Sequence, residues 1–212
     1  IPYYLVVEPH EATNYEDSYG KDKVLVLPLS NMGTVVYARN WIKEHATKTG
    51  YKRHWQIDDD MHGLQHWGKA KRKRCSAQEA MCNMENFIDR YSNIAIAGVK
   101  SSAFGYNIKS PFKLNQQVYG FVLVLNETPY FWRGIHGEDT DFSLQVLSGG
   151  WCTVLFQAYQ FDTAITGTNS GGNQDIYGDD GRLKRIRELQ RRWGNKIVKI
   201  GRRWGRPQQN LG

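Results

Sequence analysis

Apolar residues along the chain fall into short runs and periodic stretches, separated by polar or glycine-rich segments. Short apolar runs bounded by turn residues predict β-strands, and apolar positions spaced by three and four residues predict helices. The predicted strands lie at residues 2–8, 23–29, 54–57, 93–99, 117–126 and 151–159. The predicted helices lie at residues 34–48, 76–91, 138–147 and 180–193.

The order of these elements predicts an α/β fold. The runs at 23–29 and 117–126 are apolar almost throughout, as in strands that are buried on both faces. A strand, a helix and a second strand over residues 23–57 predict a parallel pair joined by a right-handed crossover. Ser76 and Glu79 form a capping-box pattern, and Gly50 suits the end of helix 34–48. We therefore expect a mixed, mostly parallel, Rossmann-like sheet flanked by helices.

A chain of 212 residues is long enough for one domain with a substantial core. It has no run of about 18 apolar residues and no signal-peptide pattern at its start, so we expect no membrane association. Because the sequence begins at Ile1 rather than Met, it reads as a trimmed chain or a fragment. Its cysteines (Cys75, Cys82 and Cys152) are odd in number and lack a zinc spacing, which favours reduced thiols in a cytoplasmic protein.

The net charge of +7 is unevenly distributed. Residues 182–212 hold 11 Lys or Arg and one acid, whereas residues 1–181 hold 17 Lys or Arg and 20 acids. This asymmetry predicts a catalytic domain over 1–181 and a basic, helical and extended segment over 182–212, packed on the same domain. It also favours an anionic partner, with nucleic acid ahead of membrane. The candidate contacts are Arg191, Arg192, Arg202 and Arg203, together with Lys71 and Arg72 in a basic stretch that could equally be a solvated loop.

Two acidic clusters carry the candidate chemistry. Asp58, Asp59 and Asp60 follow the strand at 54–57, and three adjacent carboxylates repel one another unless a cation joins them. Magnesium and manganese prefer such oxygen ligands. Alternate strand residues share a face, so Asp58 and Asp60 can share a site while Asp59 points elsewhere. Glu138 and Asp139 form the second cluster at a predicted helix start. An acidic surface turn and simple pairing with the helix dipole are the respective alternatives.

The chain resembles GT-A glycosyltransferases over roughly residues 23–60, on the order Gly33, Ala38-Arg39-Asn40, a helix, Gly50, a strand and the Asp cluster. The Asp cluster matches their DxD motif, and Gly137-Glu138-Asp139 matches their xED motif. The resemblance implies a UDP-sugar donor with Mn²⁺ or Mg²⁺. It places the metal on Asp60 and Asp58, and the donor near Arg39, Asn40, Asp58 and Asp59, although Arg39 could equally be a surface arginine of the helix. Asp139 would be the base for the acceptor hydroxyl, and Glu138 would position the acceptor or the helix.

A closer resemblance rests on Trp55-Gln56-Ile57-Asp58-Asp59-Asp60 and on the stretch from Gly137 to Gln145. Both are similar to the TET-associated glycosyltransferases, a family known mainly from bacteriophages and implicated in adding sugars to 5-hydroxymethylated pyrimidines in DNA. The resemblance implies a DNA acceptor, most simply 5-hydroxymethylcytosine, and a phage-infected host cell as the setting. The target base would have to leave the base stack for its hydroxymethyl group to be reached.

One departure and two alternatives stay open. Many GT-A enzymes take a further metal ligand from a histidine near the C-terminus, but all six histidines precede the last third of this chain. Asp162, Asp175 or water could substitute. Asp58, Asp60, Glu138 and Asp139 could instead hold the two metals of a nuclease. A non-catalytic nucleic-acid-binding module would explain the basic segment but would leave the three aspartates without a role.

Overall fold

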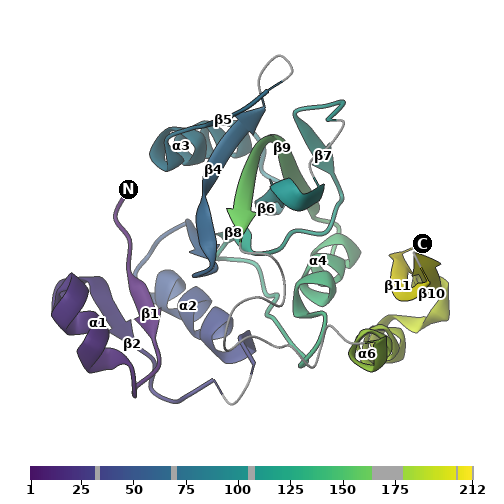
Figure 1. Ribbon diagram of the computed structural model, residues 1–212, viewed down its shortest axis with the longest axis horizontal. Helices are drawn as coiled ribbons and strands as arrows, with labels where there is room; N and C mark the ends of the chain where they lie inside the picture. Colours follow the sequence, from purple (N-terminus) through teal and green to yellow (C-terminus); the bar gives the residue numbers. More distant parts are fainter. Residues whose placement is uncertain (32–33, 68–70, 105–107, 164–178, 204, 212) are drawn as a thin grey trace.

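The computed structural model describes residues 1–31, 34–67, 71–104, 108–163, 179–203 and 205–211. Its centre is a seven-stranded sheet in the order β3-β8-β6-β9-β4-β5, with β7 also paired to β9 (Figure 1). The bounds of these strands are β3 Arg53–Ile57, β4 Met61–Trp67, β5 Arg72–Arg74, β6 Ile94–Ser101, β7 Phe112–Leu114, β8 Phe121–Leu125 and β9 Cys152–Thr163.

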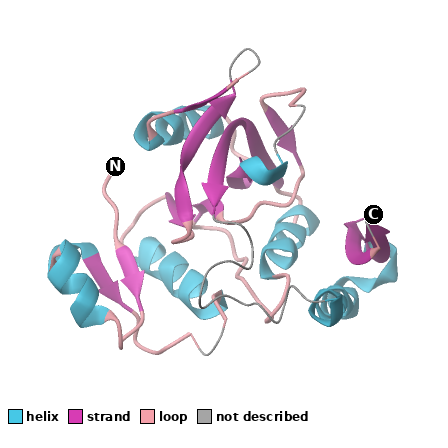
Figure 2. Cartoon of the chain, in the orientation of Figure 1, coloured by secondary structure: helices cyan, strands magenta, loops and turns pink. Residues whose placement is uncertain are grey.

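Two smaller sheets lie outside the central one. β1 (Leu5–Val7) and β2 (Val24–Val26) form a parallel pair. β10 (Val198–Arg203) and β11 (Arg206–Leu211) form an antiparallel hairpin at the C-terminal end. Figure 2 shows these two pairs on opposite sides of the molecule, with the central sheet between them.

The α/β class is confirmed, but the mostly parallel sheet is not what the structure shows. β6 and β9 are parallel, whereas the β3–β8, β6–β8, β4–β9, β4–β5 and β7–β9 pairs are antiparallel. The predicted parallel pairing of strands 23–29 and 54–57 is also wrong, because β2 pairs with β1 and β3 pairs with β8. A continuous apolar run indicates that helices or loops cover both faces of a strand; it does not indicate the direction of the neighbouring strand.

The burial of β2 corrects a second expectation from the sequence. Residues 23–29 were expected to be covered on both faces, yet Val26 keeps 38% of its surface exposed, while Val24 and Leu27 are buried. Val24 and Val26 point to the same face of this two-stranded sheet, so that face is covered at Val24 and open at Val26. β8 behaves as its pattern predicts, because all five of its residues are buried.

The predicted helices all form, with small shifts at their ends. They are α2 Val36–Lys48, α3 Ala77–Ile88, α4 Glu138–Ser148 and α6 Asp179–Ile197. The Ser76 hydroxyl accepts a hydrogen bond from the Glu79 amide, as the capping box requires, and Gly50 has φ +80° just after α2. α6 is interrupted by Gly194, which lies outside helical backbone geometry. α1 (Ala12–Tyr19) was not predicted, because it buries no residue and therefore has no apolar stripe to detect.

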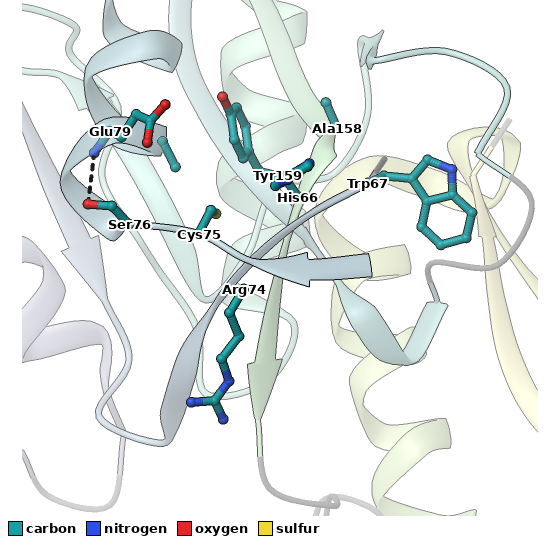
Figure 3. A pocket seen from close by; sticks show the side chains of 9 residues that line it. His66, Trp67, Arg74, Cys75, Ser76, Glu79, Ala158 and Tyr159 are labelled. Atoms are coloured by element: carbon teal, nitrogen blue, oxygen red, sulfur yellow. Dashed lines mark hydrogen bonds between the residues drawn. The ribbon is translucent and has the colours of Figure 1, made fainter. Parts of the chain in front are cut away.

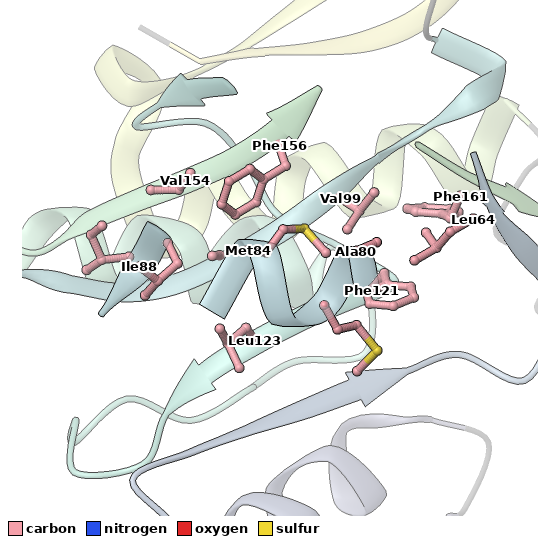
Figure 4. Close-up of a cluster of buried hydrophobic side chains, with 13 residues drawn as sticks. Leu64, Ala80, Met84, Ile88, Val99, Phe121, Leu123, Val154, Phe156 and Phe161 are labelled. Atoms are coloured by element: carbon pink, nitrogen blue, oxygen red, sulfur yellow. The ribbon is translucent and has the colours of Figure 1, made fainter. Parts of the chain in front are cut away.

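The core lies on both faces of the central sheet. On one face, Ala80, Met84 and Ile88 of α3 pack against Val99, Leu123 and Phe156 (Figure 4). On the other, Val122 and Val124 pack against Trp132 and against Phe142 and Val146 of α4. Successive β8 residues therefore serve opposite faces, as the strand period of two requires.

A third, smaller cluster joins α6 to the rest of the chain. Ile186, Leu189 and Val198 are fully buried, with Leu144 of α4 and Trp193 against them. The C-terminal segment therefore packs on α4. The predicted domain limit at residue 181 stays a prediction. Among the described helices, none has the length and apolar character needed to cross a membrane. The three cysteines are free.

Candidate active site

The turn that carries the three aspartates is fixed to the sheet at its first residue. The Asp58 amide donates to the Gly120 carbonyl at 3.0 Å, directly beyond the paired residues of β3 and β8. Gly120 has φ +71°, and a Cβ there would lie 3.1 Å from Met61 Cε and 3.4 Å from Asp58 Oδ2. Asp58 is therefore held close against backbone that only glycine accommodates easily.

Arg39 connects the two predicted acidic clusters. Its Nη2 lies 2.9 Å from Asp58 Oδ1 and 3.9 Å from Asp139 Oδ2. The Arg39 side chain is only 6% exposed, so it is not a surface arginine of α2. Burial opposes its charge, but the carboxylates of Asp139, Asp58 and Glu138 outweigh that effect and raise the Arg39 pKa. One buried guanidinium thus brings together residues that are far apart in the sequence.

Trp132 holds Asp139 from the other side, and sequence reasoning missed it. Its indole N–H donates to Asp139 Oδ1 at 3.1 Å, and its ring stacks on Phe142 with centroids 3.9 Å apart. Asn40 fixes the Trp132 backbone in both directions: Nδ2 donates to the carbonyl at 2.8 Å, and Oδ1 accepts from the amide at 2.9 Å. The sequence signal is weak: Phe131 and Trp132 form an aromatic pair before the xED-like motif, and the apolar residues around them show no periodicity.

The carboxylates near Arg39 form an acidic corner and differ in their surroundings; they are Asp58, Asp59, Asp60, Glu138 and Asp139. Burial, and then the charges of Asp139, Asp60 and Asp59, raise the pKa of Asp58 to about 6, although Arg39 opposes the shift. Burial and the neighbouring Asp139 raise the Glu138 pKa. Asp59 is exposed, whereas Asp58 and Asp60 are half-buried. An acidic corner that disfavours its own negative charge is a site where a bound cation would be stabilised.

The donor set fits a magnesium or manganese ion only if substrate completes it. Within the described ranges, no three His, Cys, Asp or Glu side chains converge on one metal position. Mg²⁺ commonly keeps water and binds one or two carboxylates together with substrate phosphates. Asp58 and Asp60 could supply these carboxylates, because Arg39 contacts Asp58 Oδ1 and leaves Oδ2. Asp162 accepts a hydrogen bond from Gln65, and Asp175 lies outside the described residues.

The comparison with family models decides the class of protein. The model of the TET-associated glycosyltransferases matches residues 1–172. The chain belongs to this family. No curated protein and no solved structure matches the chain significantly. Because the family is one of glycosyltransferases, membership favours sugar transfer over the nuclease and the binding-module alternatives. The match contains every residue of the acidic corner and ends before α6.

A second carboxylate of the α4 first turn has a different setting. Asp141 is fully buried and accepts from Arg133 Nε at 2.7 Å, Gln145 Nε2 at 2.8 Å and Trp193 Nε1 at 2.8 Å. Gln209 of β11 reaches the preceding residue, donating to Thr140 Oγ1 at 3.0 Å. Three separate segments, represented by Arg133, Trp193 and Gln209, thus hold the first turn of α4, which presents Glu138 and Asp139.

The predicted nucleic-acid contacts lie on other elements. Lys71, Arg191 and Arg202 are exposed. Arg72 of β5 donates to the Ser102 carbonyl at 3.1 Å and lies 5.7 Å from the Trp67 ring centroid. Arg192 is tied to Glu188 within α6. The backbone of Arg203 belongs to β10, but its side chain falls outside the part of the chain that the structure describes.

The structure also contains a pocket that the predicted site residues do not line. Its volume is about 520 Å³, and it lies between β4, β5, β9 and the start of α3. The residues that line it include His66, Cys75, Ser76, Glu79 and Tyr159. The side chains of Trp67 and Arg74 point away from these residues (Figure 3). The Asp58–Asp60 turn precedes the opposite end of β4, so this pocket is separate from the acidic corner.

Proposed function

We propose that this protein is a GT-A-type hexosyltransferase that moves a sugar from a UDP-sugar to a hydroxyl acceptor, 5-hydroxymethylcytosine in DNA. Family membership supports sugar transfer. The observation that carries the assignment of the site is the Arg39 bridge, which places a DxD-like carboxylate and an xED-like carboxylate on one guanidinium. The two motifs then serve one reaction centre rather than two surfaces.

The donor side of the reaction needs charge neutralisation. When the bond from the sugar to the diphosphate breaks, negative charge grows on the leaving phosphate. Mn²⁺ or Mg²⁺, held by Asp58 and Asp60, would neutralise that charge as a Lewis acid. Arg39 orients Asp58 through the 2.9 Å contact, so one oxygen of that carboxylate is left for the donor side.

The acceptor side needs a base, because a hydroxymethyl group does not ionise at neutral pH. Asp139 takes the hydroxyl proton as the acceptor oxygen bonds to the sugar carbon and the diphosphate departs. Trp132 occupies Asp139 Oδ1, whereas Oδ2 has Arg39 Nη2 at 3.9 Å, beyond hydrogen-bond distance, and can accept from the acceptor hydroxyl. Glu138, whose pKa is raised by burial and by Asp139, holds a proton more readily and would position the acceptor.

The test is direct transfer to defined DNA. Duplexes containing 5-hydroxymethylcytosine, 5-methylcytosine or cytosine are incubated with a panel of UDP-sugars and Mn²⁺ or Mg²⁺, and the digested nucleosides are weighed by mass spectrometry. We expect a hexose on the hydroxymethylated base alone, lost in chelator and restored by metal.

Matched variants of the aspartate turn sharpen the metal assignment. Asp60→Ala should abolish transfer, whereas Asp59→Ala, at the exposed neighbour, should weaken donor binding at most and should keep the dependence on metal. Full activity of Asp60→Ala in chelator would overturn the metal site. Absence of product with every sugar and duplex would overturn the acceptor.

A further inference from the structure

The outer face of α6 carries a stripe of cations. Lys184, Arg187 and Arg191 are exposed and are separated by three and four residues, so they share one side of the helix. At a rise of about 1.5 Å per residue, the stripe extends for about 10 Å. Like charges at this spacing repel one another and weaken an isolated helix. A polyanion bound along the stripe would remove that cost.

The inner face of α6 is already occupied. Ile186 and Leu189 are fully buried in the cluster that includes Leu144 of α4. A Cβ on Gly137 would meet Leu189 Cδ1 at 3.0 Å, so α6 lies tightly against the residue that precedes Glu138. Because the apolar side of the helix is covered, it has no hydrophobic face to insert into a membrane. The free face offers charge alone, which suits a phosphate backbone.

The hairpin after α6 extends the same charge. Lys199, Arg202 and Arg206 are exposed on β10 and β11, and no acid occurs between residues 189 and 212. α6 begins with Asp179 and Asp180, and its further acid, Glu188, binds Arg192 rather than the stripe. The family match ends at residue 172, so this surface is additional to the matched region.

We propose that the outer face of α6, formed by Lys184, Arg187 and Arg191, is a docking surface for the phosphate backbone of duplex DNA. The packing of α6 on α4 fixes this surface relative to the turn that presents Glu138 and Asp139. The Trp193 indole reinforces that link by donating to Asp141 at 2.8 Å. The inference rests on the proposed function for its acceptor, and it assigns the acceptor's backbone to a defined surface of the protein.

The experiment measures binding to duplex DNA that contains no hydroxymethyl group, so it does not depend on transfer. The variant is the triple Lys184→Glu, Arg187→Glu and Arg191→Glu in the full chain. Each lost phosphate contact should make the log–log slope of affinity against salt shallower by about 0.9, so the triple variant should flatten it by about 2 to 3. Its affinity at low salt should also fall by about tenfold or more.

A matched control separates a local surface from net charge. The triple Lys21→Glu, Lys48→Glu and Arg90→Glu makes the same charge change at exposed positions on other elements and should keep the wild-type slope. Thermal melts and donor hydrolysis should be unchanged in both triples. An unchanged slope in the α6 triple, or an equal loss in the control, overturns the inference. So does binding to phosphatidylserine vesicles that is lost in the α6 triple while duplex binding persists.

Discussion

Asp139 and Asp141 lie two residues apart in the first turn of α4, yet their surroundings are opposite. Asp141 is fully buried and accepts hydrogen bonds from Arg133, Gln145 and Trp193. Asp139 keeps 15% of its side chain exposed, accepts one hydrogen bond from Trp132 and has Arg39 at 3.9 Å. A carboxylate whose oxygens are all occupied can hold structure together, whereas one with a free oxygen can accept a proton.

The same contrast separates two cations of α2. Arg39 and Lys43 lie one turn apart, and both are buried. Arg39 faces Asp58 and Asp139, which raise its pKa despite burial. Lys43 faces no carboxylate among its hydrogen-bond partners; it donates to the Thr128 and Tyr130 carbonyls at 2.5 Å, and burial lowers its pKa to about 8. The partners of a buried charge, rather than its type or depth, decide what it does.

The largest expected effect is on activity at Asp139. Asp139→Asn keeps the shape and the acceptor oxygen for Trp132 but removes the base, so transfer should fall by about 10²–10⁴-fold. The affinity for the UDP-sugar and the free energy of unfolding should stay near the wild-type values. Steady-state kinetics, donor titration and urea unfolding measure the three quantities. If donor binding and donor hydrolysis collapse together, Asp139 belongs to the donor site instead.

Asp141→Asn should show the reverse pattern. Asn keeps one acceptor oxygen but replaces the other with an NH2 donor and removes the charge, so Arg133, Gln145 and Trp193 cannot all keep an acceptor. We expect the free energy of unfolding to fall by about 2–4 kcal/mol. The value is below that of a fully buried pair because Arg133 is 50% exposed. Urea unfolding of Asp141→Asn beside Asp139→Asn checks the contrast. Equal stability of the two variants would remove the distinction between them.

Lys43 predicts a pH dependence of stability. Its folded pKa of about 8 lies below the usual 10.5, so between these pH values the unfolded chain binds the proton and the folded chain does not. Stability should therefore rise with pH across this window, by up to about 3 kcal/mol, and should be insensitive to Lys43 below pH 8. The measured quantity is the difference between wild type and Lys43→Met in urea unfolding from pH 7 to 10.5. A flat difference would show that the two carbonyls keep the ammonium charged.

The smallest effect is expected at the contact between α6 and α4. Trp193→Phe keeps the aromatic ring but removes the donor to Asp141, which should cost about 1–3 kcal/mol for a hydrogen bond to a charged group. Trp67→Phe is the control, because Trp67 lies at the end of β4 and is not one of the donors to Asp141. Differential scanning calorimetry of the two variants gives the comparison. Similar melting temperatures for both would mean that the indole N–H contributes nothing to the α4 turn.

The sequence alone determined much of this protein. The apolar periods predicted α3, α4 and α6, which carry apolar residues toward the core. α2 was placed by its position before Gly50, and it buries Arg39 and Lys43 together with Ala46. The motifs around Asp58 and Asp139 predicted membership of the TET-associated glycosyltransferases, which the family match confirms. The metal, the UDP-sugar, the DNA acceptor and the individual site roles stay predictions. The helices and the family motifs were visible in the sequence because each depends on residues close together in the chain.

Only the tertiary structure decided which distant residues meet. Periodicity reports which side of an element is buried, but it does not report the neighbour, so β3 was paired with β2 instead of β8. Arg39 could not be separated from a surface arginine until its contacts with Asp58 and Asp139 placed it inside. Trp132 and Trp193 carry no local pattern, because each acts through one indole N–H on a carboxylate of α4. Hydrogen bonds between remote segments depend on packing, and packing is a property of the whole fold.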